Sequence, residues 1–315
     1  MSTLFKKPNE LEFVTTIKML IYGQPGTGKT SMALSAPNPV MFDFDGGIQR
    51  VNVAFQCPTL QVKNWEEVLS ALEELKSGDV ECKTIIVDTA GKMLDFMSDY
   101  IMRNDSKMKM RDGSLSLKGY GARKVMFQSF LRDVSMIGKN IVFVAHEREE
   151  KDGETKIVRP EIGGSSAGDL MKELDLVGYV QVIGQDRTVY WTPQEKFYAK
   201  NSCNLPAWQK IPVIVDENGN VTQKNDTLQK VFGYYEANVK KIEEMRTRYN
   251  ELIEKITTAI EQITDTKGAN DFANAIASTE VIWDSKVRAR ELFRAKVDEL
   301  KLRWNAKDKT YEQAV

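Results

Sequence analysis

The residues from Gly23 to Thr30 can bind a polyphosphate. They read Gly-Gln-Pro-Gly-Thr-Gly-Lys-Thr, the full G-x-x-x-x-G-K-T pattern of a phosphate-binding loop. In this pattern the glycines let backbone N–H groups surround the phosphates, and the lysine reaches the β and γ phosphates. We predict an ATP site formed by Gly23, Gln24, Pro25, Gly26, Thr27, Gly28, Lys29, Thr30 and Ser31.

The flanks of this loop favour the same interpretation. An apolar, strand-like run at residues 17–22 precedes it, and a helix-like run at residues 31–36 follows it. A chance match in a glycine-rich turn does not require such flanks, whereas a nucleotide site needs a strand before the loop and a helix after it.

A magnesium site is predicted from Thr30 and Asp88. The run of apolar or β-branched residues 84–87 closes on Asp88, a Walker-B pattern when it lies downstream of a phosphate-binding loop. A carboxylate there accepts a water of the Mg²⁺ shell, and the Thr30 hydroxyl is placed to hold the ion.

A second carboxylate is needed to activate water, because Asp88 is followed by Thr89 and not by glutamate. Asp45, which follows the strand-like run of residues 40–44, is the candidate general base. The alternative is that Asp45 is only a turn residue before Gly46-Gly47.

The elements that position these residues alternate between strand and helix. Helices are expected at residues 65–76, 92–103 and 122–137, and a further strand at residues 140–145 ends at His146. This alternation predicts an α/β fold with a mostly parallel, doubly wound sheet. Because ligands bind at the carboxyl ends of such strands, Gly23, Asp45, Asp88 and His146 should converge.

In combination these motifs resemble the RecA-like ATPase core, and in particular phage-encoded RecA-like ATP-binding proteins of single-strand annealing and recombination. The resemblance spans roughly residues 17–206. The stretches that carry it are 23–30, 42–47, 85–89 and 138–147.

The resemblance implies further roles. Asp45 matches the catalytic carboxylate, where glutamate is usual, and His146 matches the polar residue that senses the γ-phosphate. Residues 147–169 match a mobile DNA-binding loop. The alternative for His146, the only histidine of the chain, is a strand-end residue hydrogen-bonded to a neighbour.

The resemblance also implies that Lys200 reaches the phosphate of a neighbouring subunit, although Ser202 stands where an arginine is common. Lys196 could substitute for the missing cation. The alternative for both lysines is a solvated edge of a hairpin at residues 188–200.

A basic segment at residues 103–124 is the predicted contact for single-stranded DNA. It holds seven Lys or Arg against two Asp, together with Tyr120, although the net charge of the chain is only −1. Cations that follow phosphates and a ring that stacks on a base are typical of single-strand grooves. The alternative is a solvated connection between helices. The predicted contact residues are Lys107, Lys109, Arg111, Lys118 and Arg123.

Composition limits the class of protein. The chain has 315 residues, 42% of them hydrophobic, and lacks the run of roughly 18 apolar residues that a membrane span requires. Its three cysteines fit no metal spacing. We expect a cytoplasmic protein of a bacterial host cell without a membrane partner.

Two domains are predicted, a nucleotide-binding core at residues 1–235 and a helical C-terminal arm at residues 236–315. A coiled-coil-like seam of Ile242, Met245, Tyr249, Leu252, Ile256, Ala259 and Ile263 runs along the arm. We expect a further helix that extends from Trp283 to Trp304. The arm either contacts another subunit or packs on its own core.

The leading functional hypothesis is an ATP-hydrolysing recombination protein that acts on single-stranded DNA as a homo-oligomer, with the active site completed between subunits. A single-strand-binding or replication protein is a further expected partner. The alternative is a nucleotide-switched loader or adaptor that binds a replication or recombination partner through the arm. A small-molecule kinase is the third candidate.

Overall fold

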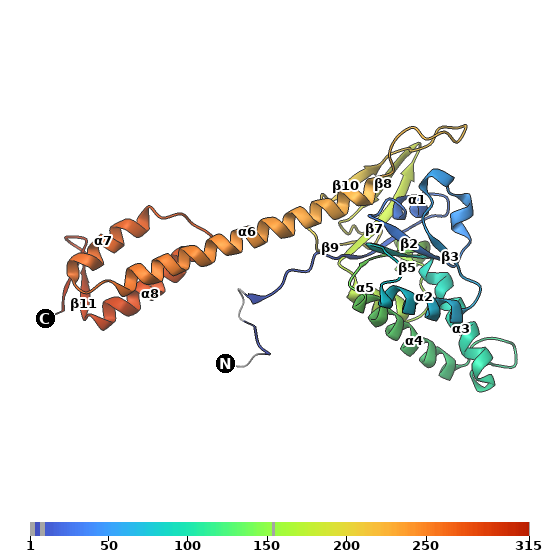
Figure 1. Ribbon diagram of the computed structural model, residues 1–315, viewed down its shortest axis with the longest axis horizontal. Coiled ribbons are helices and arrows are strands. Elements are labelled where there is room, and N and C mark those ends of the chain that lie inside the picture. Colours follow the sequence, from blue (N-terminus) through green and yellow to red (C-terminus); the bar gives the residue numbers. More distant parts are fainter. Residues whose placement is uncertain (1–3, 7–9, 153–154, 315) are drawn as a thin grey trace. The chain divides into compact units, whose positions relative to one another are not determined.

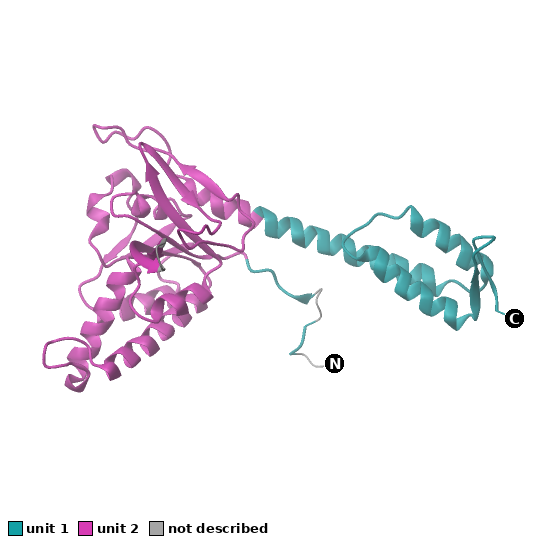
Figure 2. Ribbon diagram, turned by 180° about the vertical axis from the view of Figure 1, so that it is seen from behind, with its two compact units in different colours: residues 1–14, 237–315 teal, residues 15–236 magenta. Residues whose placement is uncertain are grey.

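The computed structural model describes residues 4–6, 10–152 and 155–314 (Figure 1). The chain forms two compact units (Figure 2). We call residues 15–236 the core unit, and residues 1–14 with 237–315 the arm unit. Helix α6 (Thr227–Glu261) begins in the core unit and continues into the arm unit, so the predicted boundary after residue 235 falls inside a helix.

The core unit is built on a mixed, mostly parallel sheet. Its strand order is β10-β8-β7-β1-β5-β4-β2-β3, with β6 paired to β5 and β9 paired to β7. The six strands from β7 to β3 in this order are parallel, whereas β6, β8, β9 and β10 are joined to their neighbours by antiparallel pairing. The strands are β1 Lys18–Gly23, β2 Pro39–Asp43, β3 Thr59–Gln61, β4 Thr84–Asp88, β5 Asn140–Asp152, β6 Thr155–Pro160, β7 Leu176–Ile183, β8 Asp186–Tyr190, β9 Lys200–Asn201 and β10 Trp208–Ile211.

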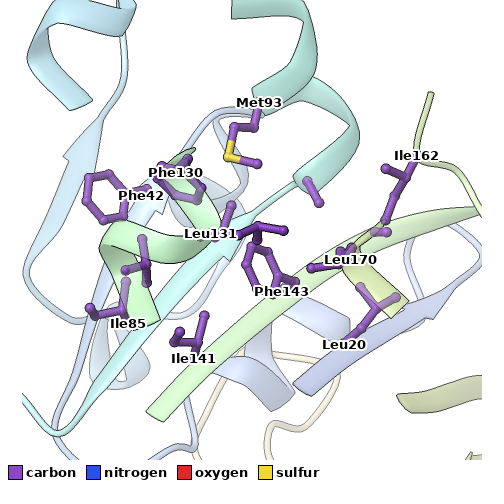
Figure 3. Close-up of a cluster of buried hydrophobic side chains, with 14 of the residues drawn as sticks. Leu20, Phe42, Ile85, Met93, Phe130, Leu131, Ile141, Phe143, Ile162 and Leu170 are labelled. Carbon is purple, nitrogen blue, oxygen red and sulfur yellow. The ribbon is translucent and has the colours of Figure 1, made fainter. Parts of the chain in front are cut away.

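Helices cover both faces of this sheet. One face packs against α2, α3, α4 and α5, and the other packs against α1 and the first turns of α6. Figure 3 shows the first of these cores, where Met93 of α3 and Phe130 of α4 lie over strand residues such as Phe143. The helices are α1 Lys29–Ala33, α2 Trp65–Ser77, α3 Ala90–Asn104, α4 Leu117–Met136 and α5 Ser166–Glu173. The predicted α/β fold with a mostly parallel, doubly wound sheet is therefore confirmed.

Burial on both faces explains why the central strands are apolar runs. In β1, Met19 and Ile21 point to the α1 side while Leu20 and Tyr22 point to the other side, and all four are fully buried. A strand enclosed on both faces needs apolar residues at every position, since successive side chains alternate between the faces.

The strand order decides which strand ends meet. β5 lies between β1 and β4, so that Gly23 of β1 pairs with His146 and Asp88 of β4 pairs with Val144. β2 lies on the far side of β4, and its Asp43 pairs with Asp88. The carboxyl ends of these four strands therefore form one continuous edge.

The arm unit has a small core of its own. It is formed by the end of α6 with α7 (Thr266–Ala277), α8 (Ser285–Glu299) and the hairpin of β11 (Leu302–Asn305) and β12 (Thr310–Gln313). Ile256 and Ile260 of α6 pack against Phe293 of α8 within this core. Ala259, which the predicted seam includes, is exposed. The C-terminal part of the seam therefore packs within the chain.

The expected last helix is shorter than predicted. Trp283 precedes α8 and Trp304 lies on β11, and each is half exposed. In the part of the chain that the structure describes, no helix is both long enough and apolar enough to cross a membrane.

Candidate nucleotide-binding site

The phosphate-binding loop joins β1 to α1 at the carboxyl edge of the sheet. Gly23 closes β1 where β7 comes very near, since a Cβ there would lie 2.3 Å from the Val180 carbonyl oxygen. Gly28 precedes α1 with a φ of +87°, which glycine adopts without strain. At the start of α1, the Met32 amide donates to the Gly28 carbonyl at 2.9 Å. The amides that precede it have no acceptor within the helix, so they can donate hydrogen bonds to a polyphosphate.

Lys29 lies inside this loop. Its Nζ donates to the carbonyl oxygens of Gly23 at 2.9 Å and Gln24 at 2.6 Å. Burial lowers the pKa of Lys29 to about 8, although the Asp88 and Glu147 carboxylates act in the opposite direction. The loop thus holds a cation at the position that the phosphate groups of a nucleotide require.

The predicted metal residues are in direct contact. The Thr30 hydroxyl donates to Asp88 Oδ2 at 2.6 Å, and the Asp88 side chain is almost fully buried at the end of β4. Burial raises the pKa of Asp88 to about 6, against the hydrogen bond from Thr30. A hydroxyl and a carboxylate are ligands that suit Mg²⁺, which keeps several waters and is completed by phosphate oxygens. The two side chains therefore fit this ion.

Asp45 lies beside this pair on the turn after β2. The turn is held by Asp43, whose carboxylate accepts hydrogen bonds from the amides of Gly47 at 2.9 Å and Ile48 at 3.2 Å. A Cβ on Gly47 would lie 3.5 Å from Asp88 Oδ2, so the turn passes directly over the acidic strand. The Asp45 side chain is 26% exposed, a position from which it can reach a water molecule.

His146 connects the two halves of the site. It ends the regular part of β5 between the strands that carry Gly23 and Asp88, and its Nε2 is 3.8 Å from Asp45 Oδ2. Its Nδ1 is buried without a hydrogen-bond partner among the described residues. The convergence of Gly23, Asp45, Asp88 and His146 therefore occurs in the structure.

Comparison with known proteins agrees with this geometry. The profile of the AAA domain matches residues 15–203, well over half of the chain. The chain belongs to the AAA domain family. Among solved structures, it is similar to a KaiC-like protein of the hyperthermophilic archaeon Pyrococcus horikoshii OT3, with 11% sequence identity, 55% of this chain and 77% of that chain covered, and a TM-score of 0.32. No curated protein matches the chain.

The AAA domain accounts for the predicted P-loop core and supports a nucleotide and Mg²⁺ as its ligands. Thr89, which follows the acidic residue of β4, is the N-cap of α3 and accepts a hydrogen bond from the Lys92 amide at 3.4 Å. A threonine hydroxyl is a weak base, so a carboxylate from another strand is still needed to activate water.

Sequence reasoning missed three residues of the site. Asp43 ends β2 and fixes the turn that carries Asp45. Glu147 has a buried Oε2 without a partner among the described residues and raises the pKa of Lys29. Arg187 lies on β8 with its Nη1 3.2 Å from the point where a Cβ on Gly28 would stand. Only Glu147 had a local signal, since it directly follows His146.

Lys200 lies away from this edge of the AAA domain. It pairs with Val177 near the start of β7, which corresponds to Leu20 on β1, about 10 Å back from the phosphate-binding loop. Its Nζ donates to the carbonyl of Leu174 and, at 3.5 Å, to that of Met171, both at the C-terminal end of α5. The lysine thus has a structural role within its own fold, and the predicted role across a subunit interface gains no support from these contacts.

The expected hairpin at residues 188–200 is also wrong. β8 pairs with β7 and β10, and β9 pairs only with β7. Lys196 is exposed on the connection between β8 and β9.

The predicted DNA-binding residues do not all lie on a loop. Lys118 and Arg123 belong to α4, because that helix begins at Leu117. Arg123 donates to Ser98 Oγ at 3.2 Å and lies 4.9 Å from the centre of the Tyr120 ring. The other three predicted residues, Lys107, Lys109 and Arg111, lie on the connection between α3 and α4 and are exposed. None of these three forms an ion pair within the described residues.

In the predicted mobile loop at residues 147–169, most of the described residues are in regular structure; residues 153–154 lie outside them. β5 continues to Asp152 and forms an antiparallel ribbon with β6, and α5 begins at Ser166. Ion pairs join the two strands of the ribbon, such as that of Lys156 with Glu149 at 2.8 Å. The expectation of an irregular, glycine-rich loop was wrong, whereas a role in DNA binding stays a prediction.

Proposed function

We propose that this chain is a Mg²⁺-dependent ATPase that acts on single-stranded DNA as an oligomer in phage-type recombination. The observation that carries the ATPase proposal is the contact of Thr30 with Asp88 at 2.6 Å beneath a complete phosphate-binding loop, with Asp45 and His146 on the adjoining strand ends. The AAA domain match supports the same chemistry.

In this proposal each residue has a distinct task. The Lys29 ammonium and the loop amides bind the phosphates, and Thr30 and Asp88 hold Mg²⁺, which when bound offsets charge on the phosphate oxygens. The Asp45 carboxylate orients the attacking water and accepts its proton, while the turn fixed by Asp43 keeps it in place. His146, whose Nε2 faces Asp45, is placed to sense the terminal phosphate and to transmit its presence along β5.

The DNA part of the proposal is supported by the connection between α3 and α4. Lys107, Lys109 and Arg111 are exposed there, and Lys118 is exposed on the first turn of α4. Tyr120, half exposed and stacked with Arg123, offers an aromatic surface beside these cations. Free cations near an aromatic ring are what a sequence-independent single-strand groove uses.

A nucleotide-switched loader or adaptor is the second candidate. The observation that favours it is the arm unit, a separate small core whose surface exposes half of the side chains of Trp283 and Trp304. Exposed tryptophans often anchor protein partners. In this candidate the ATP site acts as a switch and the arm unit binds a replication or recombination protein.

ATP turnover measured with and without single-stranded DNA tests the proposal. We expect DNA to stimulate phosphate release by wild-type protein, and the triple variant Lys107→Ala/Lys109→Ala/Arg111→Ala to lose most of that stimulation. The slope of log affinity against log salt should become shallower by about 2, because each phosphate contact contributes about 0.7 on a single strand.

A matched triple variant in the arm unit, Lys301→Ala/Lys307→Ala/Lys309→Ala, removes the same charge from exposed positions. It should retain wild-type DNA stimulation. Normal ATP turnover that DNA does not change would contradict the DNA proposal and favour the loader. If only the arm triple variant loses the stimulation by DNA, then DNA binds the basic C-terminal region instead.

A further inference from the structure

Arg187 places a cation directly against the phosphate-binding loop. It lies on β8, between Val182 of β7 and Ile211 of β10 in the sheet register. Its Nη1 and Cζ lie 3.2 Å and 3.9 Å from the point where a Cβ on Gly28 would stand. The guanidinium therefore lies against the glycine whose flanking amides would face the polyphosphate of the proposed nucleotide site.

No carboxylate of the described residues is paired with this guanidinium. Within the described residues Arg187 forms no ion pair and its side chain has no hydrogen-bond partner, although the side chain is half-buried. The carboxylate next to it in sequence, Asp186, is paired instead with Lys210 at 3.1 Å. A half-buried, uncompensated cation is unfavourable unless a ligand of opposite charge binds there.

The surroundings leave room for such a ligand. Gly28, Ser31 and Arg187 line one cavity of about 110 Å³ beside the first turn of α1, and Arg50 also lines it. Arg50 is already engaged with Asp45, at 3.4 Å between Nη2 and Oδ2. Arg187 is thus the arginine of this cavity that is free to bind an anion.

We propose that Arg187 is a second cation of the nucleotide site, and that it binds the polyphosphate of a nucleoside di- or triphosphate from the same subunit. This inference rests on the proposed nucleotide site. Lys29 approaches the phosphates from inside the loop, and Arg187 approaches from the β7–β8 hairpin on the outside. A guanidinium can donate two parallel hydrogen bonds to phosphate oxygens, which an ammonium cannot.

A consequence concerns the assembly of the site. The RecA-like resemblance implies that a second cation comes from a neighbouring subunit. With Arg187 at Gly28, the polyphosphate has two cations within one chain. Binding of ADP and ATP then requires no contact between subunits.

Calorimetric titration of Mg²⁺–ATP and Mg²⁺–ADP tests this role without relying on turnover. We expect Arg187→Ala to bind both nucleotides about 10- to 100-fold more weakly than wild type, the usual size of a lost charged hydrogen bond. ADP should lose as much as ATP, because the loop amides around Gly28 hold the α and β phosphates. Arg187→Lys, which keeps the charge but not the two-pronged geometry, should lie between wild type and Arg187→Ala.

The matched control is Lys210→Ala, which removes one cation from the neighbouring strand β10 and should bind both nucleotides as wild type does. If Arg187→Ala fails to fold by circular dichroism, Arg187→Gln, which keeps most of the side chain, replaces it in the comparison.

The outcomes separate two failures. If wild-type protein binds neither nucleotide, the proposed function itself is wrong. If wild type binds and Arg187→Ala or Arg187→Gln binds equally well, the nucleotide site stands and the role of Arg187 is refuted. An equal loss in Lys210→Ala would also overturn the proposal, because it would reveal a general effect of net charge.

Discussion

Replacing Asp88 by asparagine should stabilise the folded protein while removing Mg²⁺-dependent nucleotide binding. Only 2% of Asp88 is exposed, and burial raises the pKa of its carboxyl from 3.8 to about 6. At neutral pH the folded chain therefore carries an unfavourable buried charge. Asparagine has no charge and keeps an oxygen that can accept the hydrogen bond of Thr30.

The sign and size follow from proton linkage. A pKa that is higher in the folded state than in the unfolded state means that the folded state binds the proton more tightly. The contribution of Asp88 to stability is then fully present below about pH 4 and is lost as the pH rises through about 6. The rise of the Asp88 pKa from 3.8 to about 6 corresponds to about 3 kcal/mol, which is the upper limit of the gain expected for Asp88→Asn at pH 7.5.

Urea unfolding of both proteins between pH 5 and pH 8, without Mg²⁺, measures this difference. The gap in unfolding free energy should widen as the pH rises and level off above about pH 7. Asp45→Asn is the matched control, since the Asp45 side chain is partly exposed and its charge loses less hydration on folding. An Asp88→Asn protein that is no more stable than wild type at pH 7.5, or a gap independent of pH, would refute the reasoning. Adding Mg²⁺–ATP should stabilise wild type and leave the variant unchanged.

Three further predictions concern single residues. Asp45→Asn should lower ATP turnover, measured by phosphate release, by about a hundredfold with unchanged ATP affinity; normal turnover would assign water activation elsewhere. Because burial lowers the pKa of Lys29 to about 8, Lys29 of the protein without nucleotide should lose its proton as the pH rises above about 8, and ATP affinity measured by calorimetry should fall. An affinity that stays constant from pH 7 to 10 would contradict this prediction. Lys200→Ala should reduce stability by about 1 kcal/mol, since it removes a cation from the C-terminal carbonyls of α5, and should preserve turnover. Lower turnover at unchanged stability would restore its predicted role between subunits.

The nucleotide loop and the strands around it could be predicted because their signals are local. A phosphate-binding loop is defined by eight consecutive residues, and strands buried on both faces are continuous apolar runs. The convergence of Asp45, Asp88 and His146 followed from one general rule, that parallel strands end at the same edge.

Arg187 could not be predicted in this way. Its contact with Gly28 depends on the antiparallel pairing of β8 with β7, which brings together residues far apart in sequence. Nothing in the sequence around Arg187 distinguishes it from any other arginine of a hairpin. The same applies to Lys200, whose partners on α5 depend on the pairing of β9 with β7.

The two segments that were wrongly predicted to be loops differ from the prediction for specific physical reasons. The helix expected at residues 122–137 begins earlier, at Leu117, and includes Gly119; a Cβ on Gly119 would lie 2.9 Å from the Met108 carbonyl oxygen, so close packing requires a glycine there. The charged run after His146 has the composition of a loop, but cross-strand ion pairs such as that of Lys156 with Glu149 accommodate it in a two-stranded ribbon.

The most direct test of the central claim is a calorimetric titration of Mg²⁺–ATP into wild-type protein and Lys29→Ala. The wild type should bind one nucleotide per chain. The variant should bind none, because it lacks the ammonium that the carbonyls of Gly23 and Gln24 hold inside the loop, and its circular dichroism spectrum should match that of wild type. Equal ATP affinity in the two proteins would show that the nucleotide, if it binds at all, binds somewhere other than the loop from Gly23 to Thr30.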